Sequence, residues 1–250
     1  MIKIALIGCG WLGIPLAIKL LQQKYVVFGS TTNPAKLSIL ENAGILPFLY
    51  DGTSSDSMPD WSADIDFLIL NFPPSKSENY PKQIASILQQ FPPICKVIFT
   101  SSTGVYQEIE GNVMEDSEVN KDHPVFLAET EVRTAQQKFT ILRLAGLIGP
   151  NRHPAKFFSG RTMKDGNMFV NLVHLNDVIA AIEQIMKQGC DNKTFNVCSP
   201  EHPKKAIYYL EKTKELQIPA PLVEFSDKLG KKVDGSRITK ELHFNYSFEI

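Results

Sequence analysis

The 250-residue sequence predicts an α/β protein built on a doubly wound parallel sheet, and two observations carry this prediction. Short apolar runs alternate with longer segments of helical periodicity over the first 150 residues. Strand, crossover helix and strand repeated in this way build a parallel sheet with helices on both faces. A glycine-rich segment also follows directly on the first apolar run, at the position of the phosphate-binding turn in dinucleotide-binding folds. We therefore expect a doubly wound parallel-sheet Rossmann fold with a small C-terminal substrate lobe.

The individual elements follow from apolar periodicity and from turn residues. The run 2–7 is apolar except for Lys3, as in a strand buried on both faces. The segment 14–23 has apolar residues at helical spacing, with Pro15 in the first turn, where proline is tolerated. The further expected strands are 25–28, 45–50, 66–70, 95–100 and 140–144, and the further expected helices are 34–42, 80–90, 127–137, 177–187 and 203–216.

The pattern loosens after residue 150. We expect residues 1–150 to form the NAD(P)-binding Rossmann domain and residues 151–250 the small lobe, with 172–198 returning to the sheet. The polar segment 107–123 is expected to be a loop, and the lysine-rich stretch 228–232 a solvated turn.

Composition excludes several classes of function. Lys and Arg number 26 against 27 Asp and Glu, so the net charge of −1 gives no electrostatic footprint for nucleic acid or an anionic membrane. The longest apolar runs fall far short of the ~20 residues that span a bilayer. The four cysteines are widely spaced and lack the spacing of a zinc site, so we expect reduced thiols, no metal and a cytoplasmic protein.

The segment 8–13 reads Gly-Cys-Gly-Trp-Leu-Gly and matches the pattern GxGxxG. In a strand–turn–helix context the glycines permit a tight turn, close approach of a pyrophosphate and close packing of the helix on the strand. The N-terminus of the helix then offers N–H groups and a positive dipole end to the phosphates. The cofactor-binding residues expected in this loop are Gly8, Gly10, Trp11, Leu12 and Gly13.

The residues after the second strand bear on the choice between NADP and NAD. A carboxylate at this point accepts a hydrogen bond from the ribose 2′-hydroxyl of NAD. Here the chain carries Ser30, Thr31, Thr32 and Lys36 and reaches its first carboxylate only at Glu41. Hydroxyl and ammonium donors suit the 2′-phosphate of NADP, so NADP is preferred to NAD. The alternative is that the hydroxyls merely begin the next helix.

The ends of the third and fourth strands should also face the cofactor, because open α/β sheets bind ligands at the carboxyl ends of their strands. The expected contacts there are Asp51, Asn71, Phe72 and Pro73.

Four segments then appear in a fixed order. The run 97–106 ends a strand in paired serines followed by Val105 and Tyr106, and 142–150 has the form Arg-x-x-x-x-x-Gly-Pro. A His-x-x-Asp unit at 173–178 precedes a helix, and 194–197 ends in Asn-Val. Together they resemble the extended short-chain dehydrogenase/reductases, the NAD(P)-dependent epimerase/dehydratase-like family. The resemblance covers about residues 1 to 200, and the glycine loop and chain length are most similar to a small, atypical branch.

The resemblance implies an oxidoreductase or epimerase/dehydratase chemistry on a nucleotide-sugar-like or small carbonyl/hydroxyl substrate. Family members use a serine, which Ser102 matches, with a Tyr-x-x-x-Lys unit about 25 residues later. The window 122–131 contains neither tyrosine nor lysine. A substitute acid/base is therefore sought in His123, Tyr106 or Glu129.

Other functions stay open beside this one. Without a substitute, Ser102 and bound water would leave a slow reductase, or the chain would be a non-catalytic NADP-binding redox sensor. A β-hydroxyacid-type NADP dehydrogenase fits the first ninety residues, although the long helical domain of that family has no counterpart here.

Two residues of the second half are expected to meet substrate. Arg152 follows Gly149-Pro150, and a guanidinium binds a diphosphate bidentately. His174 falls where the family often approaches its cleft; the alternative is a packed histidine, with Asp177 capping the helix that follows. We expect a monomer or homodimer.

Overall fold

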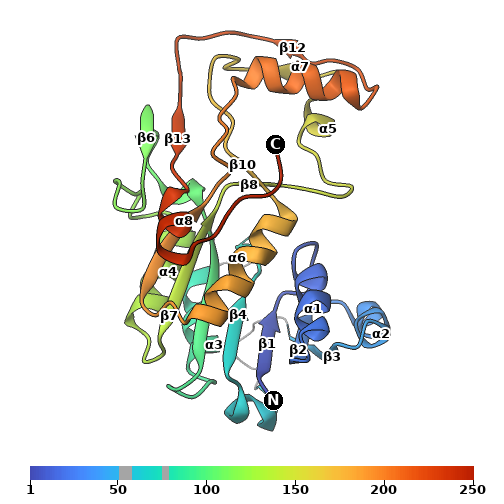
Figure 1. Cartoon of the computed structure of the whole chain (residues 1–250), viewed down its shortest axis with the longest axis vertical. Helices are drawn as coiled ribbons and strands as arrows, with labels where there is room; N and C mark the ends of the chain where they lie inside the picture. Colours follow the sequence, from blue (N-terminus) through green and yellow to red (C-terminus); the bar gives the residue numbers. More distant parts are fainter. Residues whose placement is uncertain (51–57, 75–78) are drawn as a thin grey trace. The chain divides into compact units, whose positions relative to one another are not determined.

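The computed structural model describes residues 1–50, 58–74 and 79–250 (Figure 1). Asp51, expected to contact the cofactor, lies outside the described residues. The central element is a seven-stranded sheet of order β11-β7-β5-β4-β1-β2-β3. Its strands are β1 (Lys3–Ile7), β2 (Val26–Thr31), β3 (Leu46–Leu49), β4 (Phe67–Leu70), β5 (Lys96–Ser102), β7 (Phe139–Leu144) and β11 (Lys193–Val197).

This order confirms the predicted doubly wound Rossmann fold. The chain builds outward from β1 through β2 to β3 and then crosses back to place β4 on the other side of β1. All the pairings from β3 to β5 are parallel. The strand order therefore reverses between β1 and β4, which is where open α/β sheets bind ligands.

Helices connect the strands where apolar periodicity predicted them. They are α1 (Gly13–Gln22), α2 (Leu37–Asn42), α3 (Tyr80–Leu88), α4 (Pro124–Thr134) and α6 (Leu175–Gln188). Helix α1 contacts β2 and helix α2 contacts β3, whereas α4 contacts both β5 and α3. Most of their buried positions are apolar, such as Leu16 and Leu20 of α1, so burial of these side chains holds the helices on the sheet.

The structure differs from the sequence prediction in three places: the end of one strand, the start of one helix and a segment expected to be a loop. Strand β5 continues through Ser102, so both serines belong to the strand. Helix α4 begins at Pro124 because the imidazole of His123 caps it, accepting a hydrogen bond from the N–H of Val125 at 3.2 Å. The expected loop 107–123 contains β6 (Gly111–Val113), which pairs with β13 (Lys231–Val233), so the end of the lysine-rich stretch is strand and not a solvated turn.

The chain divides into two compact units, and the boundary predicted at residue 150 stays a prediction. Unit 1 comprises 1–105, 120–143 and 182–195; unit 2 comprises 106–119, 144–181 and 196–250. Unit 2 holds the remaining elements: β6, β8 (Gly146–Ile148), α5 (Ala155–Phe158), β9 (Thr162–Met163), β10 (Leu172–His174), α7 (Lys205–Glu215), β12 (Leu222–Val223), β13 and α8 (Ser236–Leu242). Its apolar cluster includes Met163, Leu172 and Tyr209.

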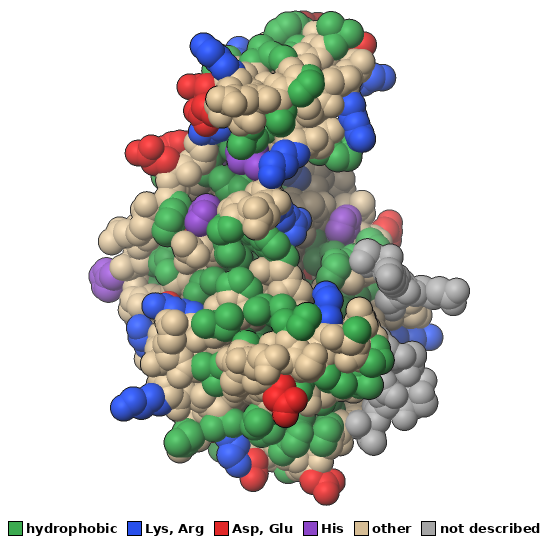
Figure 2. Space-filling model, turned by 90° about the vertical axis from the view of Figure 1, so that its right-hand side faces the viewer, with side chains coloured by type: hydrophobic (Ala, Val, Ile, Leu, Met, Phe, Trp, Pro, Cys, Tyr) green, Lys and Arg blue, Asp and Glu red, His purple; other side chains and the backbone are tan. Residues whose placement is uncertain are grey.

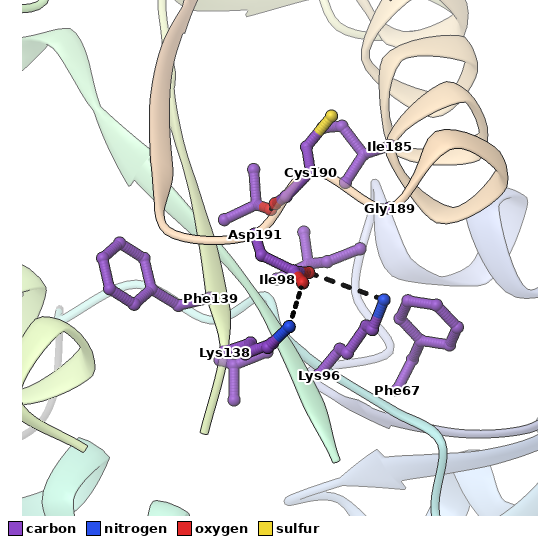
Figure 3. A pocket seen from close by; sticks show the side chains of 11 residues that line it. Phe67, Lys96, Ile98, Lys138, Phe139, Ile185, Gly189, Cys190 and Asp191 are labelled. Atoms are coloured by element: carbon purple, nitrogen blue, oxygen red, sulfur yellow. Dashed lines mark hydrogen bonds and ion pairs between the residues drawn. The ribbon is translucent and has the colours of Figure 1, made fainter. Parts of the chain in front are cut away.

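The amino ends of β5 and β7 are tied together by a bridging carboxylate in unit 1. Figure 3 shows Asp191 between two ammonium groups, at 3.5 Å from that of Lys96 and 2.7 Å from that of Lys138. These contacts lower the pKa of the Asp191 carboxyl, chiefly through the hydrogen bond from Lys138. The cluster lies at the strand edge opposite the glycine loop and is structural.

Four broader expectations can be compared with the described residues. No helix in that part of the chain is long and apolar enough to cross a membrane. Within the same residues, no group of three or more His, Cys, Asp or Glu side chains is placed to hold a metal ion. On the face in Figure 2, basic and acidic side chains are scattered among one another. The four cysteines are free, as expected of reduced thiols.

Candidate functional site

The glycine loop between β1 and α1 satisfies three separate geometric demands. Gly8 has a φ of +107°, and a Cβ there would lie 2.2 Å from the carbonyl oxygen of Asn71. A Cβ on Gly13 would lie 2.3 Å from the carbonyl oxygen of Gly8. A Cβ on Gly10, by contrast, would meet nothing within 4 Å. Packing therefore requires the first and third glycines, whereas the second leaves open space in front of the helix.

The carboxyl ends of four strands hold this loop in place. The hydroxyl of Ser30 accepts a hydrogen bond from the N–H of Gly8 at 2.9 Å. The side-chain amide of Asn71 donates to the carbonyl of Gly8 at 3.1 Å, and the hydroxyl of Thr100 donates to the Asn71 side-chain oxygen at 3.2 Å. Strands β1, β2, β4 and β5 thus fix the loop before any ligand arrives, which lowers the ordering cost of binding.

Helix α1 presents its N-terminus to the same open space. It has no side-chain cap and no acidic residue in its first turn. Its positive dipole end is therefore not neutralised by its own side chains. Trp11 is half-buried, and Leu12 is buried, so Leu12 faces the space through its backbone. Gly10 and this helix end together form the surface that a pyrophosphate would occupy.

The predicted specificity residues after β2 separate into two groups. Ser30 is buried, and its hydroxyl is used by the glycine loop. The hydroxyl of Thr31 accepts from the N–H of Asn33 at 3.1 Å and closes a local turn. Thr32 and Lys36 are exposed. The exposed pair therefore supplies the donors available to a ligand phosphate at this corner.

Some of the residues after β4 that were expected to contact the cofactor already form hydrogen bonds within the protein. The carbonyl of Phe72 accepts from the hydroxyl of Tyr80 at 2.8 Å, and the two rings pack edge to face at 5.4 Å. Pro73 is exposed, and Asn71 is half-buried with its amide spent on Gly8 and Thr100.

Ser102 and His123 approach a common point at the end of β5. The hydroxyl of Ser102 accepts from the N–H of Gly104 at 3.0 Å. A Cβ built on Gly104 would lie 3.2 Å from the Ser102 Oγ and 3.9 Å from the His123 Nε2. Because His123 Nδ1 caps α4, its Nε2 is the ring atom directed to this point. The structure thus brings together the predicted serine and one of its three candidate acid/base groups.

The other two candidates are enclosed by hydrogen bonds. Tyr106 is 3% exposed, and its hydroxyl donates to the side-chain oxygen of Asn196 at 2.6 Å within unit 2. Glu129 is fully buried in unit 1, where Arg143 donates to its two oxygens at 2.9 and 2.7 Å. Ser101 and Arg133 complete the shell of that carboxylate.

The two predicted substrate residues lie in unit 2. Arg152 is exposed, and its backbone pairs with that of Gly149. His174 stacks on Phe248 at 4.2 Å between ring centroids, and its Nδ1 accepts from the N–H of Asn176 at 3.2 Å. Burial lowers the pKa of this imidazole. Beyond these contacts the role of either residue stays a prediction.

The expectation that Asp177 caps α6 is wrong. Strand β10 runs directly into the helix at Leu175, so the cap contact falls to the His174 imidazole and Asp177 lies inside the first turn. Its carboxylate instead accepts from the N–H groups of Ser247 and Phe248 at 2.9 and 3.3 Å, which holds the C-terminal segment.

The sequence did not predict the side-chain contacts that support the site. Thr100 stands just before the paired serines and anchors Asn71, and the Glu129–Arg143 pair joins α4 to β7 beside Ser101. One signal was available: Arg143 is the charged residue of a mostly apolar strand, and a charge buried there needs a buried partner.

Comparison with known proteins places this geometry among its relatives. No family model matches the chain. Protein YeeZ from Escherichia coli (strain K12) is 36% identical over an alignment of 269 positions that covers 98% of this chain and 96% of that protein. UDP-glucose 4-epimerase from Thermotoga maritima, solved with UDP-glucose, superposes with a TM-score of 0.75 at 18% identity, over 99% of this chain and 94% of that chain. UDP-glucuronic acid 4-epimerase from Bacillus cereus, solved with NAD, has a TM-score of 0.75 at 18% identity, over 99% and 92%.

Proposed function

Since the chain belongs to the family of Protein YeeZ, we propose that it is an epimerase/dehydratase-like short-chain dehydrogenase/reductase and that it binds a nicotinamide dinucleotide at the glycine loop. We propose further that it acts as an oxidoreductase or epimerase-like enzyme on a nucleotide-sugar-like or small carbonyl/hydroxyl substrate. The observation that carries the first step is the open space at Gly10, between two glycines that packing requires.

The loop residues fit a dinucleotide in kind and in placement. Gly10 and the N-terminus of α1 would hold the pyrophosphate, and Thr32 and Lys36 would meet the adenosine ribose. No carboxylate stands between Ser30 and Lys36, so a 2′-phosphate meets no repulsion there, and we propose NADP in preference to NAD. The Bacillus cereus epimerase was solved with NAD, so cofactor choice would distinguish this chain from that protein.

When bound, the nicotinamide supplies a site that accepts or donates hydride. The chain's own contribution would come from Ser102 and His123. The Ser102 hydroxyl would donate a hydrogen bond to the reacting oxygen of the substrate, and the Nε2–H of His123 would donate a second one. The ring proton of His123 lies on Nε2 because Nδ1 accepts the N–H of Val125, so the two donors would stabilise negative charge that develops on that oxygen. Tyr106 and Glu129 are less suited, since each is already enclosed by hydrogen bonds.

A second function is favoured by one specific observation. Helix α4 follows the paired serines, where the family's Tyr-x-x-x-Lys unit is expected, and it contains neither tyrosine nor lysine. A protein that binds NADP without turnover, as a redox sensor, would need neither residue.

The binding step is tested by titrating the protein with NADPH and with NADH while following nicotinamide fluorescence and thermal unfolding. At a hundredfold excess over its Kd, a ligand stabilises by about 2.7 kcal/mol, which raises Tm by roughly 5–10 °C in a chain of this size. Gly10→Glu should abolish this rise, because its side chain enters open space and its charge repels the phosphates. The control Gln22→Glu adds the same charge at the far end of α1 and should leave binding unchanged.

Cofactor choice is tested with Lys36→Ala. This variant should bind NADPH about tenfold more weakly and NADH almost as well as the parent, because only NADPH has the 2′-phosphate that the Lys36 ammonium would contact. The proposal would be refuted if neither NADPH nor NADH bound the protein, or if the Gly10→Glu variant bound the cofactor as tightly as the parent protein.

The chemical step is tested by incubating the protein and cofactor with UDP-glucose or UDP-glucuronic acid and following products by NMR. Ser102→Ala and His123→Asn should each lower turnover by about 10²-fold or more while NADPH still binds. Asparagine keeps the cap of α4, so the second variant removes the imidazole without removing the helix start. The exposed neighbour Lys121→Ala is the control. Tight NADPH binding with no turnover of any substrate would favour the sensor.

A further inference from the structure

Strand β5 carries three hydroxyl side chains in a row at its carboxyl end, and they serve different partners. The hydroxyl of Ser101 donates to the buried carboxylate of Glu129 at 2.5 Å, and Ser102 is one of the two groups proposed above to contact substrate. Thr100 has no part in that chemistry. Its hydroxyl instead reaches toward the glycine loop by way of the Asn71 side chain, and all of these residues lie in unit 1.

The orientation of the Asn71 side chain follows from what its two neighbours can donate and accept. The carbonyl of Gly8 can only accept a hydrogen bond, so the NH₂ group of Asn71 faces it, with the nitrogen 3.1 Å from the carbonyl oxygen. The side-chain oxygen of Asn71 then faces Thr100, whose hydroxyl oxygen lies 3.2 Å away. This hydroxyl supplies the donor that the amide oxygen needs. Thr100 therefore selects the orientation in which Asn71 can hold Gly8.

The Thr100 hydroxyl has one hydrogen and two acceptors within reach. The carbonyl oxygen of Leu70 lies 3.1 Å away, and the side-chain oxygen of Asn71 lies 3.2 Å away. If the hydrogen pointed to Leu70 alone, two oxygens with no hydrogen between them would face each other at the Asn71 side, which is unfavourable. A side chain without the hydroxyl would leave the Asn71 oxygen without this donor.

The Asn71 amide lies against both of the glycines that packing requires. Its nitrogen donates to the carbonyl of Gly8, and the same nitrogen would lie 3.2 Å from a Cβ on Gly13. The backbone N–H of Asn71 donates to the carbonyl of Ile7 at 2.8 Å, so the end of β4 is tied to the end of β1 at this point. Gly8 and Gly13 flank Gly10 and its open space. The amide therefore fixes the frame in which a pyrophosphate would lie.

We propose that Thr100 is a positioning residue for the dinucleotide. Through Asn71 it holds Gly8 and Gly13 in the arrangement that the pyrophosphate needs, and this order before binding lowers the cost of binding. The inference rests on the function proposed above, because it concerns the same site. The pyrophosphate is common to NADPH and NADH, so loss of the Thr100 hydroxyl should weaken both cofactors alike, whereas loss of the Lys36 ammonium should weaken only NADPH.

The test begins with Thr100→Val, which removes the hydroxyl and keeps the shape of the side chain. This variant should bind NADPH and NADH about tenfold more weakly than the parent, because the half-buried Asn71 oxygen loses its donor. Nicotinamide fluorescence measures the two Kd values. Thr100→Ser keeps the hydroxyl and should restore binding to the level of the parent.

Thr140→Val is the matched control for a general loss of stability. Thr140 is another threonine in a strand of unit 1, and its hydroxyl donates to the carbonyl of Cys190 at the opposite edge of the sheet. Each valine variant loses one hydroxyl that donates to an oxygen, so urea unfolding should show a loss of stability in both. Only Thr100→Val should also change the Kd values.

The route through Asn71 is tested by combining substitutions. Asn71→Ala should weaken both cofactors at least as much as Thr100→Val does. The double variant should bind them no more weakly than Asn71→Ala alone, because Thr100 then has no amide to orient. If Thr100 acted on the cofactor by another route, its loss would add to that of Asn71.

The proposal is overturned if the parent binds NADPH and Thr100→Val binds it equally well, or if Thr140→Val loses as much affinity as Thr100→Val. Additive losses in the double variant also overturn it. If Thr100→Val does not fold, Asn71→Ala decides the matter, and binding as tight as that of the parent overturns the proposal. Failure of the parent itself to bind NADPH or NADH is a different result, since it refutes the dinucleotide function and this inference with it.

Discussion

The stability of unit 1 should depend strongly on the buried carboxylate of Glu129. Its side chain is fully buried, and Arg143, which is 3% exposed, donates to both of its oxygens. Glu129→Gln would keep the size of the side chain but remove its charge. The guanidinium of Arg143 would then stay buried without the carboxylate that accepts two of its hydrogen bonds.

The expected loss of stability in Glu129→Gln follows from the burial of both charged groups. Breaking a buried ion pair by removing one partner costs about 3–5 kcal/mol, because the remaining charge has no compensation. In a chain of this size, each kcal/mol lowers Tm by about 2–4 °C, so Glu129→Gln should melt roughly 6–20 °C below the parent protein. Replacing both partners, with Glu129→Leu and Arg143→Met, should recover most of this loss, because apolar groups of similar volume carry no desolvation penalty.

Urea and thermal unfolding would measure these free energies, with Glu131→Gln on the same helix as a control that should stay within about 0.5 kcal/mol of the parent. A Glu129→Gln protein as stable as its parent would show that the ion pair is not desolvated as the structure implies. A protein of full stability that has lost turnover would instead make Glu129 a catalytic group.

Three further predictions concern the glycine loop, the sheet edge and the C-terminal tail. Gly13→Ala should lower the free energy of unfolding by about 3 kcal/mol, because its Cβ would press on a backbone carbonyl. Gly10→Ala should unfold like the parent protein in a thermal scan, because its Cβ would enter open space. Equal losses in the two variants would contradict the conclusion that packing requires Gly13 but not Gly10. The pKa of the Asp191 carboxyl is lower in the folded state than in the unfolded state. Its ion pairs therefore stabilise the folded protein by up to about 1 kcal/mol at pH values above the unfolded pKa, and this stabilisation is lost as the pH falls through the folded pKa. Asp191→Asn should therefore flatten the acid limb of a stability–pH curve, and an unchanged limb would exclude this role. Asp177→Ala should expose the amide of Ser247 to rapid hydrogen exchange at a cost of about 1–3 kcal/mol, and persistent protection would show that other contacts hold the tail.

Much of unit 1 was predictable because its signals are local. Apolar runs of strand length, helical periodicity and the glycine pattern depend on residues adjacent in the chain, so the doubly wound parallel-sheet fold and the position of the loop followed from them. The same locality explains the errors. Helix α4 was expected to begin later because a histidine cap is not a usual helix start, and Asp177 looked like a cap only because acidic residues commonly are.

The sequence by itself determined the Rossmann fold, the glycine loop and the missing Tyr-x-x-x-Lys unit, since each is written in short stretches of chain. Only the tertiary structure decided what those stretches touch. Asn71 lies 63 residues from Gly8, and Tyr106 lies 90 residues from Asn196, yet each pair is hydrogen-bonded. Hydrogen bonding and desolvation act between groups that folding brings together, and no local pattern specifies which distant groups those are.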